Sequence, residues 1–264
     1  METRTVIDWL DATFHPEYQE DYDNSGFLFG EAESDYKGAL VALDLTPAVV
    51  DEAIRMGASL IVTHHPFIFS GVKRMTDATE MGRMVMQLAR NGISVYAAHT
   101  NLDNLPWGVN GILSEKLGLR NASILKPQMP GSDIGAGMVG ELPEPMAVED
   151  FLRKVKEVLG LPCVRVAPLS LLASHFSLRT VAVCGGSGAF LIEDALAAGA
   201  DIYLTADLKY HDFQRTDGRM VLADVGHYES EQFAKEIIFS LISKKFSNFA
   251  CRISETQKGF VGYI

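Results

Sequence analysis

The chain contains few cysteines, and their arrangement excludes the usual cysteine-based sites. Only Cys163, Cys184 and Cys251 occur in its 264 residues, and they form no C-x-x-C pair. A secreted disulfide framework or a thiolate zinc site would need more cysteines at closer spacing. We therefore expect three core thiols in a protein of the reducing cytoplasm.

Positive charge and long apolar runs are also scarce. The chain carries 23 Lys and Arg against 34 Asp and Glu, a net charge of −11. Nucleic-acid and anionic-membrane surfaces need clustered basic residues. No apolar run approaches the roughly 18–20 residues of a membrane span, and acids occupy the place of a signal peptide's basic region. We expect neither nucleic acid nor a membrane as a partner, and a cytoplasmic location.

Apolar residues, by contrast, make up 47% of the chain and alternate in a regular order. Apolar runs predict three strands: one at 38–44, one that ends at His64, and one at 93–98. The segments between them, 49–56 and 79–91, predict helices, and Thr46-Pro47 is typical of a helix start. A β-α-β-α-β order predicts a parallel sheet with right-handed crossovers.

The same order returns in the second half, with strands at 181–184 and 201–205 around a helix at 189–198. A shift of 142 positions (199 − 57) aligns Gly199-Ala200 with Gly57-Ala58 without a gap. Duplication and convergent α/β patterning both remain open as explanations. We predict a first α/β lobe at 1–120, a connecting segment or small subdomain at 121–176, and a second α/β lobe at 177–264 that packs with the first as one unit.

Two adjacent histidines, His64 and His65, follow the apolar run 59–63, and Pro66 ends that strand. The carboxyl ends of strands are where open α/β sheets bind ligands. Successive strand side chains point to opposite faces. Either the chain already turns at His65, so that both imidazoles serve one site, or two centres lie close together.

Two further strand ends supply a histidine and a carboxylate each. His99 and Asp103 follow one strand, and His227 and Glu231 follow another, four residues apart at the start of a helix expected over 229–244. Mixed imidazole and carboxylate ligands suit Zn, Fe or Mn. Six groups exceed the needs of one tetrahedral ion, which favours two divalent metal ions per subunit. The alternative is that each histidine is a hydrogen-bonded structural residue.

The motifs together resemble the Nif-three-like family of dinuclear-metal proteins, whose members carry the name GTP cyclohydrolase type-2 homologue. The segments that carry the resemblance are Asp23-Asn-Ser-Gly26, His64-His65, His99 to Asp103, Cys184-Gly-Gly-Ser-Gly188, Thr205-Ala-Asp-Leu-Lys-Tyr-His211 and Gly226-His-Tyr-Glu-Ser-Glu231. The chain departs from the family at Thr205-Ala-Asp207, where many relatives carry Gly-Glu, and it lacks the large domain that some members insert between the lobes.

The resemblance implies two related α/β lobes with mainly parallel sheets around a central dinuclear metal cleft, and a toroidal homohexamer. It also implies a set of metal ligands, with Glu231 as the bridge and His99 as a near neighbour. That set is His64, His65, Asp103, His227 and Glu231.

A metal-dependent hydrolase is the function we predict, in which a metal-bridging hydroxide attacks a carbonyl, amidine or phosphoryl centre. His99 would be the catalytic general acid and base, or else would orient a ligand. A small molecule or nucleotide would be the substrate, and GTP is suggested by the family name alone. A non-catalytic, metal-bearing hexameric scaffold or regulatory adaptor is the alternative, and redox chemistry is a third reading if the metals are iron.

Two other features have open interpretations. The Cys184–Gly188 loop lies between a strand and a helix, so its amides would either cradle a phosphate or form a tight turn. Lys73 and Arg74 would either receive a substrate anion or lie in a solvated loop.

Overall fold

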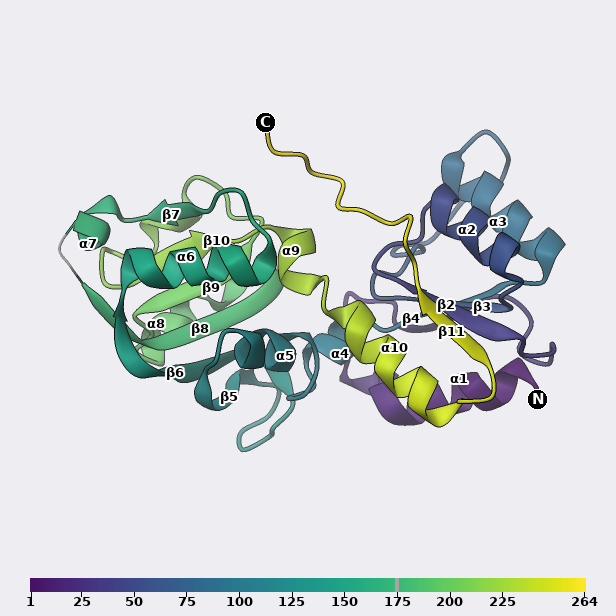
Figure 1. The fold of residues 1–264 in the computed structure, drawn as a ribbon, viewed down its shortest axis with the longest axis horizontal. Helices are drawn as coiled ribbons and strands as arrows, with labels where there is room; N and C mark the ends of the chain where they lie inside the picture. Colours follow the sequence, from purple (N-terminus) through teal and green to yellow (C-terminus); the bar gives the residue numbers. More distant parts are fainter. Residues whose placement is uncertain (174–175) are drawn as a thin grey trace. The chain divides into compact units, whose positions relative to one another are not determined.

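The computed structural model describes residues 1–173 and 176–264, and their contacts divide the chain into two compact units. The first unit comprises Met1–Leu102 and Ala234–Lys258. The second unit comprises Asp103–Phe233 and Gly259–Ile264. Figure 1 shows the chain coloured from its N-terminus to its C-terminus, and residues 234–258, near the yellow end of the scale, belong to the first unit.

The first unit is a five-stranded sheet between two layers of helices. Its strand order is β1-β4-β3-β2-β11, in which β1 is antiparallel to β4 and every other neighbouring pair is parallel. In Figure 1, α2 and α3 lie on one side of this sheet and α1 and α10 on the other. The strands are β1 (Gly26–Phe29), β2 (Gly38–Ala42), β3 (Leu60–Thr63), β4 (Ser94–Ala97) and β11 (Ala250–Ile253). The helices are α1 (Thr3–Phe14), η1 (Pro16–Tyr18), α2 (Pro47–Met56), α3 (Glu80–Asn91) and α10 (Ala234–Lys245).

Local sequence explains these elements. All residues of β2, β3 and β4 are buried, as continuous apolar runs predict for strands covered on both faces. The Thr46 hydroxyl accepts a hydrogen bond from the Val49 amide and begins α2, and Gly57 ends it at a φ of 70°. Leu40, Ile61 and Val95 pack one face of the sheet against α2 and α3. The predicted β-α-β-α-β unit is therefore confirmed.

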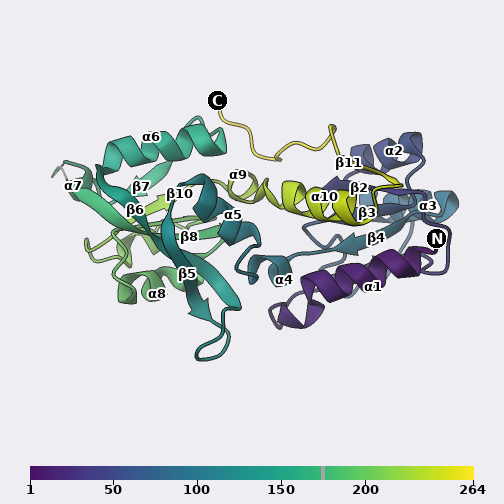
Figure 2. The same cartoon turned by 60° about the horizontal axis from the view of Figure 1, so that its bottom comes forward.

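The second unit has a six-stranded sheet in the order β5-β6-β8-β9-β10-β7. The three strands β8, β9 and β10 are parallel. β6 is antiparallel to β8, β7 is antiparallel to β10, and β5 is antiparallel to β6, so this sheet is mixed. Figure 2 shows α6 on one side of the sheet and α8 on the other. The strands are β5 (Arg120–Pro127), β6 (Gly135–Ala147), β7 (Arg165–Ala167), β8 (Ser177–Ser187), β9 (Ile202–Ala206) and β10 (Val221–Asp224). The helices are α5 (Val109–Lys116), α6 (Val148–Leu159), α7 (Leu169–Ala173), η2 (Ala189–Leu191), α8 (Ile192–Ala197), η3 (Asp212–Gln214) and α9 (His227–Glu231). A short helix, α4 (Thr100–Asp103), crosses the boundary at 102/103.

The α/β class predicted from the sequence is confirmed, and the compact units differ in extent from the predicted domains. Residues 121–176, expected as a connecting segment or small subdomain, contribute β6, which pairs with β8 in the second sheet. The second lobe was predicted over 177–264, but α10 and β11 belong to the first unit, where β11 pairs with β2. Both pairings join residues distant in sequence, which hydropathy periodicity cannot reveal.

Smaller expectations also change. The helix expected over 229–244 is two helices, α9 and α10. Of the three cysteines expected in the core, Cys184 is buried but Cys163 is exposed. Among the helices of the described residues, none combines the length and hydropathy that a bilayer span requires.

Candidate metal centre

Three histidines of the first unit form one cluster. His64 and His65 follow β3 and His99 follows β4, which are parallel neighbours, so the three side chains meet at one edge of the sheet. Each offers a ring nitrogen that lies within 4.8 Å of the others. The ring centroids of His64 and His65 are 5.0 Å apart, so the chain has turned at His65 as one shared site requires.

The Nδ1 atom of each clustered histidine has an oxygen acceptor 2.7 Å away. These acceptors are the Ala98 carbonyl for His64, Asp44 for His65 and Asp23 for His99. A carbonyl or ionised carboxylate only accepts, so Nδ1 carries a proton, and in the neutral imidazole Nε2 then carries the lone pair. This is the arrangement in which metal-binding imidazoles are held in proteins.

Asp23 is the most heavily bonded of these supporting residues. It also accepts hydrogen bonds from the Thr100 hydroxyl and amide and from the Asn24 amide. Burial alone would raise the pKa of Asp23, but the His99 imidazole and the Thr100 hydroxyl hold that pKa well below its usual value. Asp23 is therefore an ionised acceptor at neutral pH.

The second unit carries a cluster of a different composition. His227 and Glu231 begin and end α9, and His227 Nε2 lies 2.9 Å from Glu231 Oε2, which confirms that the i,i+4 spacing places them on one face. His227 Nδ1 lies 2.7 Å from Asp207 Oδ2. A carboxylate oxygen of Asp103, the last residue of α4, lies within 4.8 Å of one of Glu231.

The surroundings of His227 fit a bound cation. A neutral imidazole that donates from Nδ1 to Asp207 turns its Nε2 lone pair towards the Glu231 carboxylate, an arrangement that is repulsive at 2.9 Å. A proton or a metal ion at this position removes the repulsion. Glu231 is only 3% exposed, so water screens little of the charge. The imidazole and carboxylate donors match the ligand preferences of Zn, Fe and Mn.

The Cys184–Gly188 segment, which comprises the end of β8 and the residue after it, packs directly against Glu231. A Cβ atom at Gly186, whose φ is 61°, would overlap Glu231 Oε1. The Gly185 and Gly186 amides already donate to Asn110 Oδ1 and Ser230 Oγ, at 2.8 and 3.0 Å. Amides engaged in this way are not available to an anion, so the geometry disfavours a phosphate cradle. The other interpretation, a tight turn, also differs from the structure, because residues 184–187 belong to β8.

The sequence did not predict that the carboxylates of Asp23, Asp44 and Asp207 accept hydrogen bonds from the histidine Nδ1 atoms. Asp44 follows β2 and Asp207 follows β9, so the strand-end rule that found the histidines also applies to them. Asp207 lies at the departure from the family pattern and adopts a φ of 56°, which Asp tolerates better than most residues. Asp23 precedes β1 and is marked only by its family motif.

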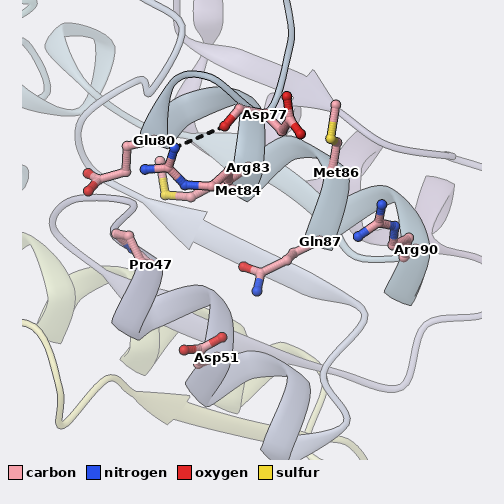
Figure 3. Close-up of a pocket in the computed structure, with 9 residues that line it drawn as sticks. All are labelled: Pro47, Asp51, Asp77, Glu80, Arg83, Met84, Met86, Gln87 and Arg90. Carbon is pink, nitrogen blue, oxygen red and sulfur yellow. Dashed lines mark hydrogen bonds between the residues drawn. The ribbon is translucent and has the colours of Figure 1, made fainter.

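A separate cavity of about 510 Å³ lies between α2 and α3 in the first unit. Figure 3 shows its lining, where Arg83 donates a hydrogen bond to the Asp77 carbonyl. Charged side chains of both signs line it, and none of the described lining residues belongs to a group of candidate metal ligands. Lys73 and Arg74 are exposed, as expected of a solvated loop.

The fold and the clusters define an α/β protein with imidazole and carboxylate side chains gathered at strand ends. The chain belongs to the Duf34/NIF3 (NGG1p interacting factor 3) family, whose sequence model matches residues 1–259.

Individual relatives agree with this assignment. A GTP cyclohydrolase 1 type 2 homolog of Clostridium perfringens is 33% identical, with 88% of this chain and 87% of the relative covered. The Streptomyces coelicolor homolog of the same name is 36% identical, with 86% of this chain and 80% of the relative covered. The crystal structure of a Staphylococcus aureus hypothetical protein superposes with a TM-score of 0.91 at 30% identity, covering 100% of this chain and 99% of the other. A Bacillus cereus protein related to NIF3 has the same fold, with a TM-score of 0.88 at 23% identity, covering 100% and 99%.

Proposed function

We propose that this chain binds two divalent metal ions and uses them for hydrolysis. The ligands are His64, His65, Asp103, His227 and Glu231. The observation that carries the proposal is the common state of the imidazoles, because all three histidines of this set have Nδ1 bound to an oxygen acceptor at 2.7 Å. That state presents Nε2 as the ligand atom and fixes the ring against rotation.

Bound divalent ions would supply Lewis acidity and lower the pKa of a coordinated water towards neutrality. The chain's own residues would then hold and move protons. His99 is suited to this role, since the ionised Asp23 carboxylate keeps the proton on Nδ1 and leaves Nε2 to accept one. His99 lies in the same cluster as His64 and His65, so orientation of a ligand is its competing role.

The substrate class we propose is a nucleotide or a related small molecule. The support is the name of the relatives, GTP cyclohydrolase 1 type 2 homolog, which describes those proteins. Cytoplasmic location fits the same proposal, because Cys163, Cys184 and Cys251 are free thiols. Assembly as a homohexamer rests on the family resemblance and is testable by sedimentation velocity.

Turnover of GTP, other nucleotides, phosphoesters and cyclic amides by metal-loaded protein tests the proposal. We expect His65→Ala and Glu231→Ala to abolish a turnover that the wild type shows. His15→Ala is the matched control, since His15 is also paired through Nδ1 to a carboxylate, Glu17, at 2.9 Å, but lies outside the clusters. Equal loss of turnover in the control would refute the assignment of the site.

A metal-bearing scaffold or regulatory adaptor is the second candidate function. The relatives' names establish no activity for this chain, and the donor sets serve a structural metal equally well. In that case the wild type binds metal but turns over none of the substrates, and Glu231→Ala changes the assembly mass instead.

A further inference from the structure

Two exposed aromatic side chains lie beside the three-histidine cluster of the first unit. Tyr22 is 60% exposed and Phe69 is 50% exposed, and their ring centroids are 6.3 Å apart. The Phe69 ring also lies 6.2 Å from the His99 ring, at an interplanar angle of 76°. We call Tyr22 and Phe69 the aromatic lip.

The same short segment holds both the lip and the cluster in place. Asp23 accepts the hydrogen bond from His99 Nδ1, and the next residue, Asn24, donates from Nδ2 to the Ile68 carbonyl at 2.6 Å. Tyr22 directly precedes Asp23, and Phe69 directly follows Ile68. The position of the lip relative to His99 is therefore fixed by adjacent residues, which gives the Asp23-Asn-Ser-Gly26 motif a structural role.

Exposed aromatic rings in this position suit a ligand. A single exposed apolar residue is ordinary, but neighbouring rings beside convergent polar groups are typical of binding sites. Aromatic faces bind flat ring systems by stacking, largely without regard to ring substituents. A planar ring stacked on Phe69 would lie next to His99, the residue proposed to move protons.

We infer that the aromatic lip binds the heteroaromatic ring of a small-molecule ligand and directs it to the histidine cluster. This inference rests on the proposed function, and it adds the two residues that select the ligand by its ring. A second copy of the chain is the competing occupant of the lip, because an exposed aromatic pair also suits an interface.

Calorimetric titration of the metal-loaded full chain tests the inference, with guanosine 5′-monophosphate as the ring-bearing probe and ribose 5-phosphate as the ring-free probe. We expect the wild type to bind the first probe at least about tenfold more tightly than the second. Phe69→Ala should lose about tenfold in affinity for guanosine 5′-monophosphate alone, and Phe69→Trp should retain it. The matched control is Phe190→Ala, which removes a phenyl ring of nearly equal exposure, 49%, in the second unit and should bind both probes as the wild type does.

Equal affinity of the wild type for the two probes, or unchanged binding by Phe69→Ala, would overturn the inference. A change in assembly mass of Phe69→Ala, with unchanged affinity for guanosine 5′-monophosphate, would assign the lip to an interface between copies. Metal content measured on each sample keeps the two proposals apart. Absent metal contradicts the proposed function, whereas bound metal without a ring preference contradicts only the lip.

Discussion

The two units carry clusters that differ in chemistry. The first unit gathers three imidazoles, whose supporting carboxylates, Asp23 and Asp44, bind the Nδ1 side of the rings. The second unit gathers one imidazole with the carboxylates of Asp103 and Glu231, which face the candidate ligand position themselves. The first cluster therefore presents imidazole nitrogens, and the second also presents carboxylates. Of these two clusters, the second is therefore the one suited to neutralising the charge of a divalent ion.

Removal of the Glu231 charge should have the largest effect on this comparison. Glu231→Gln keeps the side-chain volume but removes a negative ligand, and we expect metal affinity to fall by more than about 100-fold. Competition of the metal-loaded protein with a calibrated chelator measures this. Glu229→Gln is the control on the same helix, α9, because the Glu229 side chain approaches Gly226 and Tyr263 and belongs to no ligand group. Equal losses in the two variants would show that Glu231 has no special role.

The carboxylates behind the histidines should have a smaller effect, because they act through another residue. Asp207→Asn and Asp44→Asn each replace an anionic acceptor by a neutral one, and we expect about a 10-fold loss of metal affinity in each. The ratio of these two losses of metal affinity compares the second-unit cluster with the first-unit cluster. A loss confined to Asp207→Asn would mean that the first cluster is structural.

The close packing of Gly186 against Glu231 predicts that a larger residue at position 186 moderately lowers metal affinity and stability, through the second unit alone. Gly186→Ala adds a Cβ atom that overlaps Glu231 Oε1 at a positive φ, so metal affinity and stability should both fall, stability by about 1–2 kcal/mol. Gly199→Ala is the control, since its φ is 70° and nothing lies within 4 Å of the added atom. We expect the control to lose stability while retaining wild-type metal affinity, as measured by thermal unfolding and chelator competition.

The smallest effect should come from Glu52, a carboxylate outside both clusters whose replacement changes only the stability of the fold. Burial acts to raise the pKa of Glu52, but hydrogen bonds from Ser254, Thr256 and the Glu255 amide lower it overall. A lowered pKa means that the ionised form stabilises the fold above the unfolded-state value and that this contribution is lost as the pH falls through the folded-state pKa.

Glu52→Gln should therefore cost about 1 kcal/mol at neutral pH, and the difference from the wild type should shrink as the pH falls below about 4. Urea unfolding measured at several pH values checks this. A difference that stays constant down to pH 3 would contradict the role assigned to the Glu52 charge.

The sequence predicted the parts of the fold that depend on local pattern. The strand before His64, the helix that starts at Thr46-Pro47, and the helix at 79–91 follow from apolar periodicity and capping residues. The pairings of β6 with β8 and of β11 with β2 join distant segments, which no local pattern encodes. The extent of the compact units depends on those two pairings.

The candidate site was predictable to a similar degree. Strand ends located His64, His65 and His99, and helical spacing located His227 and Glu231. The oxygen acceptors of the histidine Nδ1 atoms were not predicted, because a hydrogen bond between residues such as Asp23 and His99, 76 positions apart, leaves no periodic pattern in the sequence. The need for glycine at position 186 likewise depends on the packed position of Glu231.

The central claim is the presence of two metal ions on these ligands. An anomalous difference map, recorded at the absorption edge of the metal found in anaerobically purified protein, tests it most directly. The account predicts two peaks per chain, bound through the Nε2 atoms of His64, His65 and His227 and the carboxylates of Asp103 and Glu231. One peak alone, a metal ion bound through an Nδ1 atom, or metal ions at other residues would contradict the two-metal proposal.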